Sequence, residues 1–361
     1  MTNGPRYVLA FAFPLVTALA LTPLAGRLAR RLGILDHPQG HKMHKQVTPY
    51  LGGLAVGGGL LLVAMITAGT SAQLLVILLG ALAMASLGLA DDWRGVGPRS
   101  KLVVEAAAAV ALWLAGARGG VLGPDALHLV VTVLWVLAVT NALNMLDNMD
   151  GVAPGVAAVS ALGFFAIAAA RGDYLVASLA LAVAGASLGF LRYNFPPARI
   201  FLGDAGSLML GFLLAALGLK LDLVGVTSVI RGALIPFLLL AVPLLDMALV
   251  VTARVQERRP VHIGGTDHTA HRLNEQGLAP RQIALAAYFV QAICCELALV
   301  LYEAPHRVVV VAGIGIATLA SAGLVVVLRL DPPTQEAEIG NRVVSVPEPR
   351  REPASEREST G

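Results

Sequence analysis

The sequence predicts an all-α polytopic membrane protein, and three observations support this fold class. First, 57% of the 361 residues are hydrophobic and only 14% are charged, with a mean hydropathy of +0.75. Second, apolar stretches of about twenty residues recur along nearly the whole chain, each long enough to cross roughly 30 Å of hydrocarbon as a helix. Third, the 38 glycines suit close helix packing in lipid, where small residues let backbones approach.

The apolar stretches predict about eleven transmembrane helices. They lie at 7–26, 51–69, 72–90, 101–117, 127–146, 152–171, 174–192, 206–221, 229–254, 281–302 and 306–330. Together they form one membrane domain over residues 1–330. The first stretch lacks a small-residue cleavage site, so we expect a retained anchor rather than a signal peptide. Residues 331–361 are rich in Pro, Glu, Arg and Ser and are expected to form a disordered cytoplasmic tail.

The distribution of Lys and Arg between the connecting loops predicts the orientation in the membrane. The loops at 27–50, 91–101, 192–205 and 254–281 carry fifteen Lys and Arg residues, whereas the opposite loops and the N-terminus carry six. We therefore expect the first set to face the cytoplasm. Most carboxylates and histidines fall on the same side, which indicates an enzyme that uses soluble substrates from the cytoplasm. The adjacent Cys294 and Cys295 are expected to be buried thiols, because neighbouring cysteines seldom bridge.

The segment "NALNMLDNMDG" at 141–151 ends an apolar stretch with five polar side chains. On a helix Asn141, Asn144 and Asn148 share one face, with Asp147 at its edge, and Asp150 lies just past the helix end. Hard oxygen donors of this kind suit Mg²⁺ or Mn²⁺ bound together with substrate phosphates. A polar seam that only joins neighbouring helices is the alternative, and it is weakened by the number of polar residues.

The segment "GLADDWRGVGPRSK" at 88–101 places Asp91 and Asp92 at a helix end, followed by Lys101. Paired carboxylates can bind a metal ion or accept a proton from an attacking group. The alternative is a charged helix end at which Lys101 merely pairs with Glu105 one turn later.

The segment "NFPPARIFLGDAGSLMLG" at 194–211 places Asp204 between two glycines, immediately before an apolar helix. The start of that helix would favour an anion such as a pyrophosphate, and Phe201 is a candidate aromatic plate for a base. The simpler alternative is an ordinary turn in which Asp204 caps its own helix.

Two further cytoplasmic segments are basic. "RRPVHIGGTDHTAHRL" at 258–273 carries His268, His271 and Arg272, which can hold phosphates or supply protons. It lacks a suitably spaced third ligand for zinc. "LDHPQGHKMHKQVTPYLGG" at 35–53 carries Lys45 and fits an anion-binding rim. Each segment alone is equally compatible with a basic loop against anionic headgroups.

In their order and loop placement, "HKMHKQVTPYLGG", "ADDW", "NALNMLDNMDG", "NFPPARIFLGDAGS" and "DHTAHRL" resemble the polyprenyl-phosphate N-acetylhexosamine-1-phosphate transferases of glycosyltransferase family 4. The resemblance covers about residues 7–330. It implies a bundle of ten or eleven helices in the bacterial inner membrane, with an active-site cleft that faces the cytoplasm and opens to the membrane. The implied reaction moves a sugar-1-phosphate, most simply GlcNAc-1-phosphate, from a UDP-sugar to undecaprenyl or another polyprenyl phosphate and leaves UMP. Nucleic acid is not an expected partner, and a homodimer is left open.

The resemblance also implies roles for individual residues. Mg²⁺, with Mn²⁺ as the alternative, would be held by Asn144 and Asp204 together with the diphosphate. Asp91 and Asp92 would lie by the lipid phosphate, one of them as its base, and Lys101 would contact phosphate. Asp147 is expected among the catalytic residues at the centre of the site, with its role left open. The residues expected to contact the rest of the substrate are Lys45, Asn148, Asp150, Phe201, His268, His271 and Arg272.

Two departures from the family pattern concern the sugar. The family often has a glycine where this chain has Asn148, and Ala270 replaces the middle histidine of its last motif. The missing histidine disfavours the branch that transfers phospho-MurNAc-pentapeptide, which remains one alternative. An ion-coupled transporter and a membrane scaffold are the others. A transporter would place essential acids near the bilayer midplane, where Asp246 and Glu296 are among the few.

Overall fold

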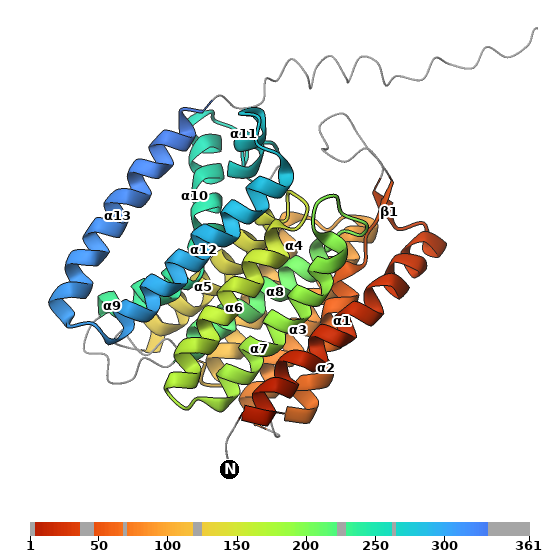
Figure 1. Ribbon diagram of the computed structural model, residues 1–361, viewed down its shortest axis with the longest axis horizontal. Helices are drawn as coiled ribbons and strands as arrows, with labels where there is room; N and C mark the ends of the chain where they lie inside the picture. Colours follow the sequence, from red (N-terminus) through yellow and green to blue (C-terminus); the bar gives the residue numbers. More distant parts are fainter. Residues whose placement is uncertain are drawn as a thin grey trace, which may run out of the picture.

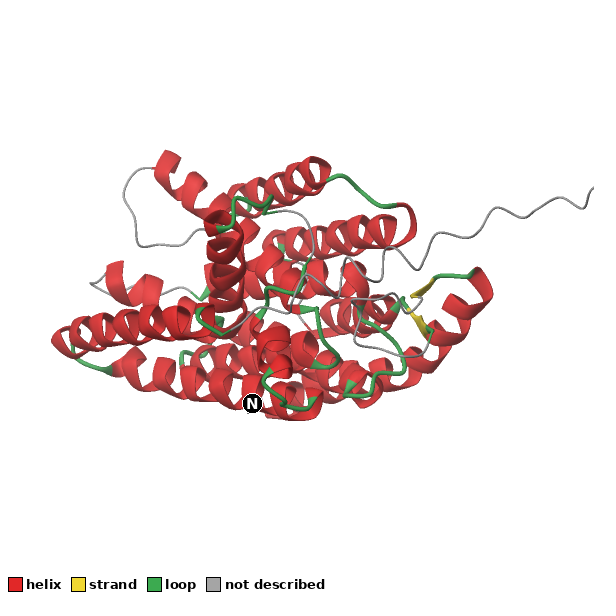
Figure 2. Ribbon diagram, turned by 90° about the horizontal axis from the view of Figure 1, so that it is seen from above, coloured by secondary structure: helices red, strands yellow, loops and turns green. Residues whose placement is uncertain are grey.

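The computed structural model describes residues 4–36, 47–67, 71–117, 125–221, 229–261 and 265–330, so Lys45 and the 331–361 segment lie outside the described residues. Helices dominate, and the expectation of an all-α membrane protein is confirmed (Figure 1; Figure 2). The elements are α1 (Gly4–Leu32), β1 (Leu35–Asp36), β2 (Thr48–Pro49), α2 (Gly52–Thr67), α3 (Ala72–Arg94), α4 (Pro98–Leu114), α5 (Asp125–Leu146), α6 (Val152–Ala170), α7 (Tyr174–Asn194), α8 (Gly203–Lys220), α9 (Val229–Leu239), α10 (Ala241–Gln256), α11 (Thr269–Glu275), α12 (Pro280–Glu303) and α13 (His306–Leu328).

Every predicted transmembrane segment coincides with a helix or, at 229–254, with two. Among the described residues, eight helices are long and apolar enough to cross a membrane, or nine if α9 and α10 count as one span. The segments predicted at 51–69 and 101–117 form the shorter helices α2 and α4, of 16 and 17 residues. Each of the eleven predicted apolar segments is therefore helical. Among the described residues, however, only eight or nine spans are long and apolar enough to cross a membrane.

The predicted span at 229–254 is bent by 89° at Leu240. Pro243 lacks the N–H that would continue the hydrogen-bond ladder to Leu239. The buried side chain of Gln291 on α12 fills the break: its amide donates to the carbonyls of Leu238 (3.1 Å) and Leu239 (2.9 Å). Its oxygen accepts the N–H of Val242 at 3.0 Å. Irregular backbone at membrane depth is tolerated where protein groups satisfy it in this way.

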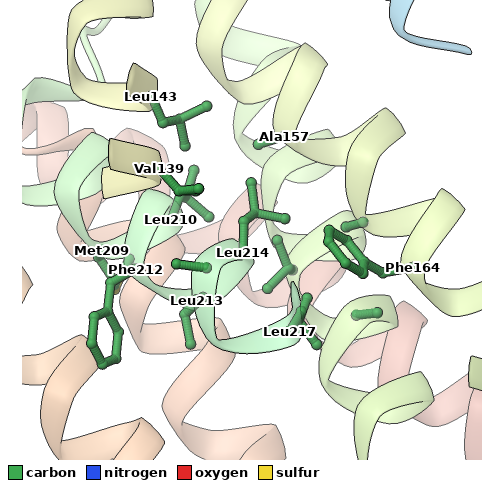
Figure 3. Packing of buried hydrophobic residues seen from close by; sticks show 14 of the residues in the cluster. Val139, Leu143, Ala157, Phe164, Met209, Leu210, Phe212, Leu213, Leu214 and Leu217 are labelled. Atoms are coloured by element: carbon green, nitrogen blue, oxygen red, sulfur yellow. The ribbon is translucent and has the colours of Figure 1, made fainter. Parts of the chain in front are cut away.

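Helix α8 is the centre of the bundle. In its apolar stretch 89% of the residues are buried, against 6% in α13 at the periphery. Figure 3 shows Leu210, Leu214 and Leu217 of α8 packed among side chains of the neighbouring helices, including Val139 of α5 and Phe164 of α6. A helix that is apolar on all sides and buried on all sides is a rigid support for groups at its end.

Glycine allows α3 to touch the start of α8. A Cβ on Gly88 would lie 2.2 Å from the backbone carbon of Asp204, so the two backbones are in direct contact. The β-hairpin and α11 lie at one end of the bundle and the N-terminus at the other (Figure 1). The polar segments singled out in the sequence therefore meet at a single end of the molecule.

Candidate active site

A cavity of about 1020 Å³ opens at this end of the bundle. Its walls come from β2 and Tyr50, the end of α3, the α5–α6 turn, the segment 194–204, the loop before α11 and the start of α12. Seven of the residues expected at the site line it: Asp92, Asp147, Asn148, Asp150, Phe201, Asp204 and His271. Residues as far apart in sequence as Asp36 and Arg281 thus form one chamber.

Asp204, at the start of α8, joins three helices. Its Oδ2 lies 2.6 Å from the ammonium of Lys101 on α4, and its Oδ1 accepts the amide N–H of Asn144 on α5 at 3.0 Å. Lys101 also lies 2.5 Å from Asp91 on α3. The interpretation in which Lys101 pairs with Glu105 is wrong for this structure, because its partners are the two aspartates.

Asp92 caps the start of α8. Its two oxygens accept the backbone N–H groups of Asp204 (3.0 Å) and Ala205 (3.2 Å). These are N–H groups of the first helical turn, which have no partner within the helix. The cap of α8 is therefore Asp92 from α3 and not Asp204. An anion held by these same two N–H groups, which the sequence suggested, would have to displace Asp92.

The three asparagines at the end of α5 and in the turn after it do not all face the cavity. Asn144 bonds to Asp204 and to Ser207 (2.9 Å), and Asn148 lines the cavity. Asn141, by contrast, donates to the fully buried Glu105 at 2.5 Å and to the carbonyl of Leu137. The single polar face expected from spacing is therefore divided: its first residue joins α5 to α4, and the others reach the site.

The turn after α5 is fixed from several sides. Gly151 has a φ of +76°, a conformation that glycine adopts without strain, and its N–H donates to Asn194 at 2.9 Å. Asp150 accepts the N–H of Ala198 at 2.8 Å, which ties the turn to the segment before α8. The rings of Phe201 and Tyr50 lie 5.8 Å apart on one wall.

The carboxylates of this wall affect one another. Burial raises the pKa of Asp147 well above the usual range, and the nearby charges of Asp204, Asp92 and Asp150 raise it further. Burial and, to a smaller extent, the charge of Asp36 also raise the pKa of Tyr50. A concentration of negative charge that raises carboxyl pKa values is a site that favours a bound cation.

The residues present fit a divalent cation. The amide N–H of Asn144 donates to Asp204, so the two side chains lie close enough to reach one ion. With the amide turned over, its oxygen and the carboxylate of Asp204 would supply the hard donors that such an ion prefers. Within the described part of the chain, no group of three or more His, Cys, Asp or Glu side chains could hold an ion alone. Mg²⁺ commonly keeps one or two protein carboxylates and completes its shell with water and substrate phosphates.

Of the described histidines in the segment 258–273, only His271 lines the cavity, beside Gly265 and Thr266 of the same segment. His268 is 5% exposed and bonds to Asp246 on α10. Arg272 does not reach the cavity: it is 2% exposed, and its guanidinium donates to backbone carbonyls at the end of α13, including that of Leu330 at 2.7 Å. The structure thus gives Arg272 a role in holding α13. Ala270 is buried and is not part of the cavity wall.

Sequence reasoning missed three residues at or behind this site. Arg199 and Arg281 both line the cavity and add positive charge to it. Their presence in two predicted cytoplasmic loops was a usable signal. Asp246 was noted only as an acid inside an apolar stretch, and its bond to His268 could not be read from the sequence.

Comparison with known proteins agrees with this geometry. The family model for glycosyl transferase family 4 matches residues 74–222, which include the cavity residues Asp92, Asp147 and Asp204. A probable undecaprenyl-phosphate N-acetylglucosaminyl 1-phosphate transferase of Bacillus subtilis is 32% identical, over 83% of this chain and 86% of that protein. The chain belongs to glycosyl transferase family 4.

Other members of the family are similarly related. A decaprenyl-phosphate N-acetylglucosaminephosphotransferase of Mycolicibacterium smegmatis is 32% identical, over 84% of each chain. A phospho-N-acetylmuramoyl-pentapeptide-transferase of Synechococcus elongatus is 34% identical, over 62% of this chain and 67% of that protein. The resemblance drawn from the sequence motifs is confirmed at the level of the family.

Proposed function

We propose that this protein transfers N-acetylglucosamine-1-phosphate from UDP-GlcNAc to undecaprenyl or another polyprenyl phosphate. The products are polyprenyl-diphospho-N-acetylglucosamine and UMP. The observation that carries the proposal is the joining of Asp204, Lys101 and Asn144 from three helices at a cavity that Arg199 and Arg281 also line. The GlcNAc-1-phosphate transferases among the relatives support this choice of sugar.

The reaction exchanges one pyrophosphate bond for another. An oxygen of the lipid phosphate attacks the β-phosphorus of UDP-GlcNAc, the bond between that phosphorus and the bridging oxygen breaks, and UMP leaves with the bridging oxygen. Because one such bond forms as another breaks, no external energy source is needed. The main barrier is the approach of two anions, which positioned cationic groups lower.

Different residues of this chain would lower this barrier in different ways. Lys101 places a positive charge beside Asp204, close to where the phosphates meet. Asp92 lines the cavity, whereas Asp91 faces Lys101 and the N–H of Val96 (2.5 Å). We therefore propose that Asp92 lies beside the lipid phosphate and that Asp91 orients Lys101. Mg²⁺ bound by Asn144 and Asp204 would neutralise charge on the diphosphate, with Mn²⁺ as a substitute.

The donor would occupy the opposite part of the chamber. Asp150 and Phe201 line the cavity where the uracil is proposed to lie, and Arg199, His271 and Arg281 supply charge for the diphosphate. A phosphate on an oily tail can reach the same chamber from the membrane boundary if this end of the bundle faces the cytoplasm. The excess of Lys and Arg in these loops supports that orientation in a bacterial inner membrane.

The test is release of UMP by the purified protein from UDP-GlcNAc, undecaprenyl phosphate and Mg²⁺, with radiolabelled lipid product as a second readout. We expect no product without the lipid phosphate or after removal of divalent cations with EDTA. Product formed equally well in EDTA would contradict the assigned cation site. A transporter or scaffold would release no UMP under any condition.

A donor panel separates the closest alternatives. UDP-GlcNAc, UDP-GalNAc, UDP-QuiNAc and UDP-MurNAc-pentapeptide are compared at equal concentration. We expect UDP-GlcNAc to give the highest kcat/KM. A preference for the pentapeptide donor would replace this function by the one that the name of the Synechococcus relative describes.

A further inference from the structure

Asp246 is a buried carboxylate that the proposed reaction does not use directly. It lies on α10, just beyond the bend at Leu240, and is 3% exposed. Its Oδ2 lies 2.8 Å from Nδ1 of His268, and its Oδ1 accepts the backbone N–H of Thr269 at 2.8 Å. A buried carboxylate is costly unless both oxygens are satisfied. Here both are satisfied by a single segment, the start of α11.

The two bonds specify where the imidazole proton lies. An ionised carboxylate only accepts hydrogen bonds, so Nδ1 of His268 must carry the proton that it donates to Asp246. The remaining ring nitrogen, Nε2, then points away from Asp246. The carboxylate therefore fixes both the orientation and the tautomer of His268, as a carboxylate behind a functional histidine commonly does.

The same contacts place the short helix α11. Its N-cap residue, His268, makes no side-chain cap of its own, and Asp246 takes the N–H of Thr269 instead. His271 follows three residues after His268, with the two ring centroids 6.0 Å apart, and lines the cavity. The position of His271 thus depends on a carboxylate that never reaches the chamber.

We propose that Asp246 is a positioning residue for the donor-binding part of the site. It locks His268 with Nδ1 protonated and anchors the start of α11, so that His271 faces the cavity. The kinetic part of this inference rests on the proposed function, in which His271 contacts the UDP-sugar. The structural part, the state of the His268 ring, does not.

The first test requires no turnover. The eight histidines are labelled with ¹⁵N, and the signal of His268 is identified by its loss in H268Q, in protein held in lipid nanodiscs. We expect Nδ1 of His268 to be protonated at neutral pH in the wild type. In D246N, where an amide N–H faces the ring, the proton should move to Nε2. An unprotonated Nδ1 in the wild type, or an unchanged ring in D246N, would overturn the proposal.

The second test is a double-mutant cycle measured by UMP release. D246N should raise the KM for UDP-GlcNAc about 10- to 100-fold while leaving the KM for undecaprenyl phosphate near the wild-type value. Because Asp246 acts through His268, D246N/H268Q should be no worse than H268Q alone. Multiplicative losses, or equal rises in both KM values, would show that D246N merely loosens the protein.

A further variant covers the case in which D246N does not fold. In H268N the amide can still donate to Asp246 from nearly the position of Nδ1, so α11 should stay anchored. Its KM for UDP-GlcNAc should lie closer to the wild type than that of H268A. A loss in H268N as large as in H268A would contradict the anchoring role. An inactive wild type would refute the proposed function, while the ¹⁵N experiment would still decide the state of His268.

Discussion

The two walls of the cavity are built in different ways. The acidic wall consists of Asp92 on α3, Asp204 on α8 and Asp147 in the turn after α5, and the backbones of α3 and α8 touch at Gly88. The histidine wall, which we define as His271 and the loop of residues 265–268, is held by side-chain bonds. These include Asp246 to His268 and an ion-paired cluster of Asp267 with Arg254 (3.0 Å) and Arg259 (2.5 Å).

This difference implies that the cavity is rigid where the phosphates react and adjustable where the donor binds. The acidic wall includes the start of α8, which is buried in the bundle, whereas the histidine wall is attached through Arg272 to α13, in which only Val309 is buried. Interiors are close-packed and transmit displacement, while separate side-chain pairs can be removed one at a time. Changes in the first wall should therefore abolish turnover, and changes in the second should adjust donor binding.

The largest expected effect is that of D204N. Removing this charge takes away the shared acceptor of Lys101 and Asn144, so we expect UMP release to fall at least about 1000-fold. Expression and the thermal midpoint in detergent should stay near wild type, because the isosteric amide preserves the fold. D173N, which alters the N-cap of α7 (Val176 N–H, 3.0 Å), is the control and should keep its turnover. An unfolded D204N would indicate a purely structural carboxylate.

Next in size is G88A, which tests the backbone contact itself. The added Cβ would meet the backbone of Asp204 at 2.2 Å and force α8 away from α3. Overpacking of this kind costs about 1–3 kcal/mol, and we expect at least a 100-fold loss of kcat with a lower thermal midpoint. G315A in α13 is the matched control, since nothing lies within 4 Å of its added Cβ. Full activity in G88A would show that the acidic wall tolerates movement.

A smaller effect is expected for D267N in the histidine wall. Burial raises the pKa of Asp267, but the hydrogen bonds from Arg259 and Arg254 outweigh burial and hold the pKa below its usual range. A depressed carboxyl pKa means that stability is gained above the unfolded-state value and lost as the pH falls through the folded-state value. The wild type should therefore lose stability on acidification from about pH 5 downward.

D267N should not show the loss of stability that protonation of Asp267 causes in the wild type. At neutral pH it should be less stable by about 1–3 kcal/mol, because two arginines lose a buried charged partner. The KM for UDP-GlcNAc should rise only a few-fold, less than in D246N. Thermal midpoints between pH 4 and 7, measured together with donor KM, check both points. An acid response in D267N identical to that of the wild type would exclude Asp267 from it.

The sequence predicted the helices well, because they follow from local pattern, and it singled out Asp92, Asp147 and Asp204, which the structure brings to one cavity. Apolar length marks the helices, and glycine next to aspartate marks the turns at Asp150 and Asp204. It did not predict partners across helices: spacing placed Asn141 with Asn144, whereas Asn141 bonds to Glu105. Arg272 looked like a phosphate ligand in a basic segment, yet it is buried against carbonyls of α13. Such pairings depend on tertiary packing, which a single sequence does not display.

The smallest effect is expected at the C-terminal end of the chain. The guanidinium of Arg272 donates to the carbonyls of Val327 (3.3 Å), Leu328 (3.4 Å) and Leu330 (2.7 Å), so these carbonyls tie α13 to the histidine wall. Removing residues 331–361 spares all three, and UMP release should stay within about twofold of wild type, since surface changes away from such contacts cost little.

A cut after Leu328 should do more, because it removes the Leu330 carbonyl and leaves the shortest of the three bonds unmade. We expect the KM for UDP-GlcNAc to rise by a few-fold while the KM for undecaprenyl phosphate stays constant, since only the histidine wall is loosened. Comparing the two truncations by donor KM and thermal midpoint isolates the contribution of Leu330. If both truncations behaved alike, α13 would not support the donor wall, and the contrast between the two walls would rest on Asp246 and Asp267 alone.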